Sequence, residues 1–217
     1  MATQSTHSTT GAQSVSTAQA SERFAGLCAI LAGIAGLLYS VSFILIKNNL
    51  LIDLFLMLGG LLTTVALTGL YNKVKEVDAT IASLAWILGI VGGLGALIHG
   101  GYDLANYINP PASSSVVNAI ASLPSSIDPR GLLTFGLAGL GSFGFAWLIG
   151  RSGMSRWLSY LSYLLAIMLV VLYLGRLIIL DPKSPLITVD GGLAGFIASP
   201  LWYIWMGAVL WMGQSKR

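Results

Sequence analysis

Six long apolar stretches dominate this sequence and limit the folds that the chain can adopt. Each holds about 20 mostly apolar residues, the length that a helix rising about 1.5 Å per residue needs to cross a hydrocarbon core about 30 Å thick. The stretches cover residues 24–46, 50–71, 79–102, 131–150, 157–180 and 187–211. They lack the alternation of a membrane β-barrel, and helices satisfy their own backbone groups in lipid. The sequence therefore predicts an all-α polytopic membrane protein with a bundle of six transmembrane helices.

Composition supports a membrane protein and excludes several other classes. Charged residues make up 9% of the 217 residues and apolar residues 55%, whereas charged residues are roughly 25% of a soluble domain. The chain has too little charge to cover a water-facing surface, to be disordered throughout or to bind nucleic acid. Its single cysteine, Cys28, excludes a disulfide framework and a cysteine-based zinc or iron–sulfur site.

The segments outside the six stretches are short, apart from the N-terminus and one loop. Residues 1–22 are rich in Ser, Thr, Gln and Ala, which predicts a disordered tail. The transmembrane domain is predicted to cover residues 23–212, followed by a short basic tail at 213–217. The long loop covers 103–130, and Asp128, which precedes a proline near its end, is expected to be a loop residue.

The basic residues are unevenly divided between the two sides of the predicted bundle. Seven lie on the side of the N-terminus, the second and fourth connections and the C-terminus: Arg23, Lys73, Lys75, Arg151, Arg156, Lys216 and Arg217. Four lie on the other side: Lys47, Arg130, Arg176 and Lys183. The positive-inside rule therefore predicts an N-in/C-in topology, with both termini in the cytoplasm.

Small residues spaced four apart predict which spans pack closely, since lipid removes most of the hydrophobic attraction between helices. Such stripes occur in the first, third, fourth and sixth spans, whereas the fifth span is bulky throughout. We therefore expect those four spans to form the tight interior and the fifth to face lipid more. A dimer interface is the alternative use of the same stripes.

Ionisable residues within membrane spans are costly and are candidate functional groups. Here they lie toward the outer face and define a candidate polar cluster: Asp53, His99, Asp103, Arg176 and Asp190. His99 and Asp103 are four apart on one helix face, so the carboxylate can orient the imidazole for proton transfer or ligand binding. A purely structural hydrogen bond is the alternative. Asp53 and Asp190 also fit the first turn or the N-cap of a helix, and Arg176 can extend to the interface or pair with an aspartate.

The sixth span contains a helix-breaking signal followed by aromatic residues. Pro200 removes a backbone donor and predicts a kink. Trp202, Tyr203 and Trp205 follow near mid-membrane, where aromatic side chains beside a kink can line a ligand cavity. These four residues are therefore candidate cavity-lining residues. The alternative is that they fill space beside glycine-rich neighbours.

No sequence pattern points to catalysis or to a bound cofactor. The sequence contains no P-loop, no GxSxG, no HExxH and no CxxC motif. His99 is the only histidine within a predicted span, because His7 lies in the N-terminal segment, so a multi-histidine metal site within one chain is excluded. We predict no catalytic residue, no metal ion and no cofactor.

The last span carries the run Pro200–Gly207, with the sequence PLWYIWMG. This run and the span layout resemble those of uncharacterised six-span bacterial integral membrane proteins. The resemblance implies a bacterial origin and the six-span fold. Such proteins have no established activity, so the resemblance implies no substrate, cofactor or catalytic residue.

Together these features favour a binding, accessory or scaffold subunit in the plasma membrane. Its partners would be the lipid bilayer and either another membrane subunit or a second copy, with no nucleic acid. One alternative is a small-solute or ion transporter or channel that uses the outer polar cluster, although the inner halves of the spans are poor in the polar residues that a conducting path needs. A second alternative is a membrane enzyme that uses His99 and Asp103 on a lipid or quinone-like substrate.

Overall fold

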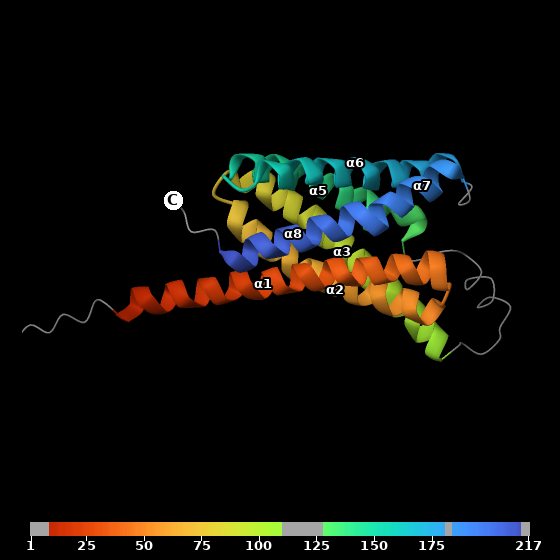
Figure 1. Cartoon of the computed structure of the whole chain (residues 1–217), viewed down its shortest axis with the longest axis horizontal. Coiled ribbons are helices and arrows are strands. Elements are labelled where there is room, and N and C mark those ends of the chain that lie inside the picture. Colours follow the sequence, from red (N-terminus) through yellow and green to blue (C-terminus); the bar gives the residue numbers. More distant parts are fainter. Residues whose placement is uncertain (1–8, 110–127, 181–183, 214–217) are drawn as a thin grey trace, which may run out of the picture.

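The computed structural model describes residues 9–109, 128–180 and 184–213, and these residues are helical with no strand. Six helical segments among them are long enough and apolar enough to cross a membrane (Figure 1): Gln19–Ile46, Asn49–Val74, Ala79–Ile108, Leu132–Arg151, Arg156–Ile178 and Pro185–Met212. Each coincides with one predicted span. The predicted all-α bundle of six long apolar helices is thus confirmed.

Three of the six segments contain a stretch of π-helix. In chain order the elements are α1 (Thr9–Val41), η1 (Ser42–Ile46, π), α2 (Asn49–Val74), α3 (Ala79–Ile108), η2 (Pro129–Gly131, 3₁₀), η3 (Leu132–Leu137, π), α5 (Ala138–Arg151), α6 (Arg156–Ile178), α7 (Pro185–Leu193), η4 (Ala194–Ala198, π) and α8 (Ser199–Met212). The π-helices prolong α1, precede α5 and join α7 to α8.

Helix α1 begins earlier than the sequence indicated. It starts at Thr9, so residues 9–22 are helical although a disordered tail was predicted there. Extending an existing helix costs far less than nucleating one, which explains how a polar segment joined to a long apolar helix continues it. An ion pair of 3.1 Å between Glu22 and Lys73 then ties this part of α1 to the end of α2. Residues 1–8 of the predicted tail lie outside the described residues.

The predicted loop at 103–130 begins with helix. Helix α3 continues to Ile108, and Asn109 is its C-cap. Residues 110–127 lie outside the described residues. Helix α8 ends at Met212, as predicted, where Gly213 takes a left-handed conformation with φ of 51°.

The six segments form a ring. Helix α1 packs against α2 and α8, α2 against α3, α3 against α5, α5 against α6, and α6 against α7 and α8. Figure 1 shows α5 and α6 along one side, α1 and α2 along the other, and α8 between them. Short connections make neighbours along the chain antiparallel neighbours in space, so the contact between α1 and α8 is the one that closes the ring.

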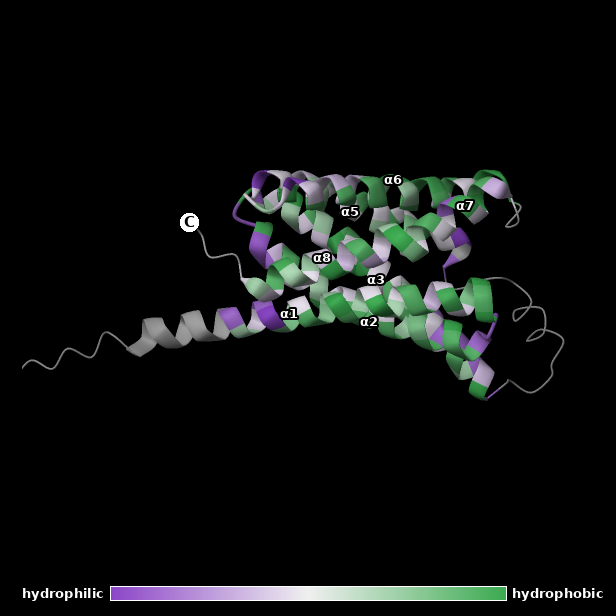
Figure 2. Ribbon diagram, viewed as in Figure 1, coloured by the Kyte–Doolittle hydropathy of each residue, from purple (hydrophilic) through white to green (hydrophobic). Residues whose placement is uncertain are grey.

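The two ends of the ring differ in charge. Figure 2 shows apolar residues along the middle of the helices and hydrophilic residues near their ends. We call the end with the connections α2–α3 and α5–α6 the basic end, because it carries Arg23, Lys73, Lys75, Arg151 and Arg156. The opposite end is called the acidic end, because Asp53, Asp103, Asp128 and Asp190 lie there.

Glycines set the closest approaches between helices, as small-residue packing in lipid requires. A Cβ atom at Gly26 of α1 would lie 2.7 Å from the backbone nitrogen of Trp211 in α8. A Cβ at Gly141 of α5 would lie 2.8 Å from the backbone nitrogen of Gly89 in α3. The four spans expected to form the tight interior thus include closely packed pairs, but the second span packs as tightly, since a Cβ at Gly60 of α2 would lie even closer to the backbone nitrogen of Leu97 in α3.

The expectation that the fifth span faces lipid more than the first, third, fourth and sixth spans is met in part, because the buried shares of the third, fourth and sixth spans are higher, at 39%, 44% and 44%. In the most apolar window of α6, 33% of the residues are buried, the same share as in the first span, whereas in α2 the share is 17%. Helix α6 has bulky side chains, but it packs against α5, α7 and α8. Lipid exposure thus depends on how much of a helix surface its neighbours cover rather than on side-chain size.

Candidate functional site

The pair His99–Asp103 lies near the acidic end of α3. Asp78 caps the start of this helix, with its Oδ1 accepting hydrogen bonds of 3.0 Å from the backbone nitrogens of Thr80 and Ile81. The regular helix that follows places positions 99 and 103 on one face, as predicted. The Nε2 atom of His99 lies 3.0 Å from Oδ2 of Asp103, and the two side chains are 24% and 42% exposed. The contact is a full ion pair when the imidazole is protonated.

Asp53 joins this pair from α2. Asp53 is only 8% exposed, and its carboxylate interacts electrostatically with both Asp103 and His99. Gly100 makes the approach possible, because a Cβ there would lie 2.6 Å from the backbone oxygen of Asp53. The cap of α2 is Asn48, which accepts a hydrogen bond from Leu51, so Asp53 lies beyond the first turn and does not serve as the cap.

Arg176 lies on α6 and makes its contacts with the start of the fourth span. Its guanidinium carbon lies 5.4 Å from the ring centre of Phe135 in η3, and its backbone oxygen accepts a hydrogen bond of 3.3 Å from Arg130. Among the described residues, no ion pair joins Arg176 to an aspartate of the cluster. The arginine is therefore held by a cation–π contact rather than by the pairing that the sequence offered as an alternative.

Tyr39 of α1 is a further polar residue of this end that sequence reasoning missed. Its phenol interacts electrostatically with both Arg176 of α6 and Asp53 of α2. Its ring also stacks with Phe43, with centroids 6.0 Å apart. A tyrosine in an apolar stretch gives no pattern by itself, so only the arrangement of α1, α2 and α6 identifies it.

Asp190 stands apart from the other members of the candidate cluster. It lies in α7, one turn before the π-helix η4, and its Oδ2 atom is buried without a hydrogen-bond partner among the described residues. An unsatisfied buried oxygen is costly, and such groups in native proteins call for an explanation such as an ion, a water molecule or a proton. The structure thus divides the predicted cluster into His99, Asp103 and Asp53 together, with Arg176 and Asp190 elsewhere at the same end.

Asp128 lies in a bend before η2, as expected of a loop residue, but it also has a role that the sequence analysis did not assign. Its buried carboxylate accepts hydrogen bonds of 2.8 Å from the backbone nitrogen of Leu133 and 2.9 Å from that of Thr134. These bonds satisfy two donors at the start of η3, where helices have unpaired N–H groups. An aspartate followed by proline just before an apolar stretch is a helix-start pattern, so the sequence did hold the signal.

The four candidate cavity-lining residues, Pro200, Trp202, Tyr203 and Trp205, do not surround one cavity. Trp202 is 1% exposed, and its indole nitrogen donates a hydrogen bond to Ser162 of α6. Tyr203 packs edge-on against Trp202, with centroids 4.8 Å apart, and hydrogen-bonds Thr63 of α2. Both residues therefore fill the centre of the ring, which is the alternative that the sequence left open.

Pro200 and Trp205 have different roles from these two. The break predicted at Pro200 takes the form of the π-helix η4, in which the Ser199 nitrogen donates to the Ala194 oxygen five residues earlier. This wider turn immediately precedes the proline, which itself has no N–H to donate. Trp205 is 40% exposed and faces outward between α6 and α8.

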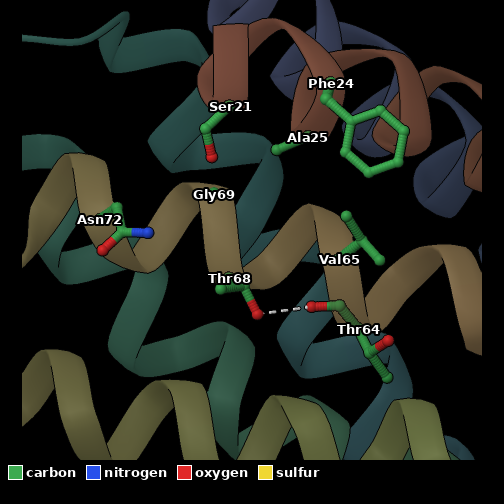
Figure 3. A pocket seen from close by; sticks show the side chains of 8 residues that line it. All are labelled: Ser21, Phe24, Ala25, Thr64, Val65, Thr68, Gly69 and Asn72. Carbon is green, nitrogen blue, oxygen red and sulfur yellow. Dashed lines mark hydrogen bonds between the residues drawn. The ribbon is translucent and has the colours of Figure 1, made fainter. Parts of the chain in front are cut away.

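Two shallow grooves lie on the outside of the ring, both in the half nearer the basic end. The α1–α2 groove of about 240 Å³ is lined by Ser21, Phe24, Ala25, Thr64, Val65, Thr68, Gly69 and Asn72 (Figure 3). Its threonine hydroxyls donate to carbonyls of their own helix, at 2.7 Å for Thr64 and 2.8 Å for Thr68. The α6–α8 groove of about 380 Å³ is lined by Trp157, Tyr160, Leu161, Leu164, Leu201 and Trp205.

The part of the chain that the structure describes contains no set of side chains suited to bind a metal ion. No group of three or more His, Cys, Asp or Glu side chains there is arranged to hold a metal ion.

Comparison with protein-family models, curated proteins and solved structures finds no match to this chain. The length and apolar composition of the six helices are compatible with a multi-pass membrane protein, and the fold identifies the chain no further.

Proposed function

We propose that this protein is a binding or accessory subunit of the plasma membrane that recognises its partner through the acidic end. The packing inside the ring carries the proposal. Toward the basic end the interior is filled by fully buried apolar side chains: Leu70, Val74, Leu148, Ile149, Leu158, Met206 and Leu210. Among the described residues, the buried polar side chains Ser40, Ser42, Asp53 and Asp128 lie toward the other end, where the ring therefore offers polar groups for recognition.

The partly exposed His99–Asp103 pair supports recognition at that end. Both side chains are accessible while Asp53 lies beside them on α2. Charged groups at a membrane surface discriminate partners through hydrogen bonds that a mismatched partner cannot form. The partner is another membrane subunit, or a second copy of this chain, with a polar segment beyond the membrane surface.

Crosslinking in native membranes followed by purification in mild detergent tests the proposal. The double variant His99→Ala/Asp103→Asn is expected to recover at least about ten-fold less of the partner than the unmodified chain, because charge-assisted hydrogen bonds contribute ~1.5–3 kcal/mol each. The matched control is Glu22→Gln/Lys73→Gln, which removes the ion pair at the opposite end and should leave recovery unchanged. A stable monomer that co-purifies with no protein contradicts the proposal.

We also propose that the basic end faces the cytoplasm, in keeping with the distribution of Lys and Arg. The only native cysteine, Cys28, is buried, so single cysteines introduced elsewhere can be labelled selectively. A membrane-impermeant maleimide added to intact cells is expected to label Asn109→Cys and to spare Lys75→Cys, both of which replace exposed residues. Permeabilised cells should label both. The reverse pattern in intact cells would invert the orientation.

A small-solute or ion transporter is the second candidate, favoured by the buried, unpaired Oδ2 atom of Asp190 beside the π-helix η4. Vesicles reconstituted with this chain alone distinguish the two. Solute accumulation that is lost in His99→Ala and Arg176→Ala would replace the accessory role with transport. The membrane-enzyme alternative has no specific observation in its favour, since neither the α1–α2 groove nor the α6–α8 groove is lined by His99 or Asp103.

A further inference from the structure

The α6–α8 groove has a uniform lining. All six residues around it are aromatic or leucine side chains: Trp157, Tyr160, Leu161, Leu164, Leu201 and Trp205. Its volume is about 380 Å³, and both walls belong to helices that are long and apolar enough to cross a membrane. Inside a bilayer this hollow opens to hydrocarbon, so the molecules that reach it are lipid chains.

The groove runs from the membrane surface toward the middle of the bilayer. Trp157 and Tyr160 belong to the first turns of α6, at the basic end, and their rings meet edge-on with centroids 5.9 Å apart. Leu164 lies two turns further into the helix, about 12 Å from its start at 1.5 Å per residue. Half of a hydrocarbon core about 30 Å thick is of similar depth. The groove therefore extends over about one leaflet, which is the length of an acyl chain.

The helix face that lines this groove begins with a cation, Arg156. Arg156 is the first residue of α6 and is exposed, and no described acidic side chain forms an ion pair with it. Positions 156, 160 and 164 follow one another at intervals of four, so Arg156 begins the same helix face that Tyr160 and Leu164 continue along the groove. A guanidinium recognises a phosphate through charge-assisted hydrogen bonds.

From this geometry we propose that the α6–α8 groove is a binding site for one anionic phospholipid. One acyl chain lies along Trp157, Leu164 and Trp205, and the headgroup phosphate contacts Arg156. The proposal commits to lipid because the groove is apolar and about one leaflet long, and because Arg156 continues its helix face toward the basic end, an arrangement that matches an anionic lipid in both chain and charge. It does not depend on the recognition role proposed for the opposite end.

Quenching of tryptophan fluorescence by brominated lipids tests the site in the full-length chain. The protein is reconstituted in phosphatidylcholine vesicles that contain a rising fraction of brominated phosphatidylglycerol or of brominated phosphatidylcholine. The quenching that disappears in Trp205→Phe reports on the groove. Half-maximal Trp205-dependent quenching is expected at a fraction of brominated phosphatidylglycerol about five-fold lower than the fraction of brominated phosphatidylcholine that gives the same quenching. One arginine near an anionic headgroup supplies a preference of this size.

Two arginine variants distinguish a site from general attraction to the basic end. Arg156→Gln is expected to abolish the preference. Arg151→Gln should retain it, because Arg151 lies at the same end but stacks on Trp147 with its guanidinium carbon 3.8 Å from the ring centre. Equal quenching by both lipids in the unmodified chain overturns the proposal, and so does a preference that survives Arg156→Gln.

If Arg156→Gln does not fold, a variant that fills the groove provides a second test of lipid binding in the same quenching experiment. Leu164 is half exposed in the groove, so Leu164→Phe adds volume there without adding a fluorescent tryptophan. It is expected to reduce the Trp205-dependent quenching by both lipids at least two-fold. Unchanged quenching contradicts an acyl chain in the groove. Absence of quenching by either lipid in the unmodified chain shows that a protein surface covers it, which also overturns the proposal.

Discussion

Replacing Trp202 with alanine is expected to lower the free energy of unfolding by about 2 kcal/mol. Trp202 is 1% exposed, and its indole links α8 to Ser162 of α6. Alanine would leave a cavity at the centre of the bundle and an unpaired serine hydroxyl. Separated helices in lipid keep apolar groups away from water, so the loss stays below the ~3–5 kcal/mol typical of water-soluble cores.

Steric trapping in bicelles measures this unfolding free energy. Trp202→Phe keeps most of the volume but loses the hydrogen bond to Ser162, so it should cost about 0.6 kcal/mol. The control is Trp205→Ala, because Trp205 is 40% exposed and faces outward; its effect should stay below about 0.5 kcal/mol. Equal losses for the two alanine variants would mean that Trp202 does not fill the ring.

Gly26→Ala is expected to destabilise the bundle by about 1–3 kcal/mol, because it forces apart the two helices that close the ring. A Cβ at this position would lie 2.7 Å from the backbone nitrogen of Trp211 and 2.8 Å from the backbone oxygen of Gly207. Both neighbouring atoms belong to the α8 backbone, which cannot rotate away as a side chain can. The added methyl group must therefore displace the whole of α8 from α1.

The matched control for Gly26 lies on the same helix. Nothing lies within 4 Å of a Cβ built at Gly36, and alanine is the better helix former by about 1 kcal/mol. Gly36→Ala should therefore leave the stability unchanged or raise it slightly in the same steric-trapping measurement. If Gly26→Ala and Gly36→Ala have the same effect on the free energy of unfolding, α1 and α8 do not pack as closely at Gly26 as the structure shows.

Several features of the acidic end could be predicted because they depend on short-range spacing. His99 and Asp103 are four residues apart, and helical geometry alone brings them to 3.0 Å. Asp128 also carried a local signal, since its capping role follows from its place just before an apolar stretch. The loop position of Asp128 was predicted correctly, but the capping role of its carboxylate was not inferred from the same signal.

Other features of this end depend on contacts between distant segments. Asp53 reaches the pair on α3 because Gly100 lets the backbones of α2 and α3 touch. Tyr39 belongs to the same end because α1 places it near both Arg176 and Asp53. Asp53 was grouped with the pair only as an ionisable residue at the same membrane face, and no sequence pattern pointed to Tyr39.

The sequence by itself determined the six helices and nearly all of their ends, because lipid forces each apolar stretch to satisfy its backbone within its own helix. Only the tertiary structure decided that α1 meets α8, that Trp202 fills the ring and that α2 is the most exposed span. These outcomes depend on how closely two backbones approach at positions such as Gly26 and Gly207. Close approach is a property of pairs of surfaces, and a pattern within one segment does not encode it.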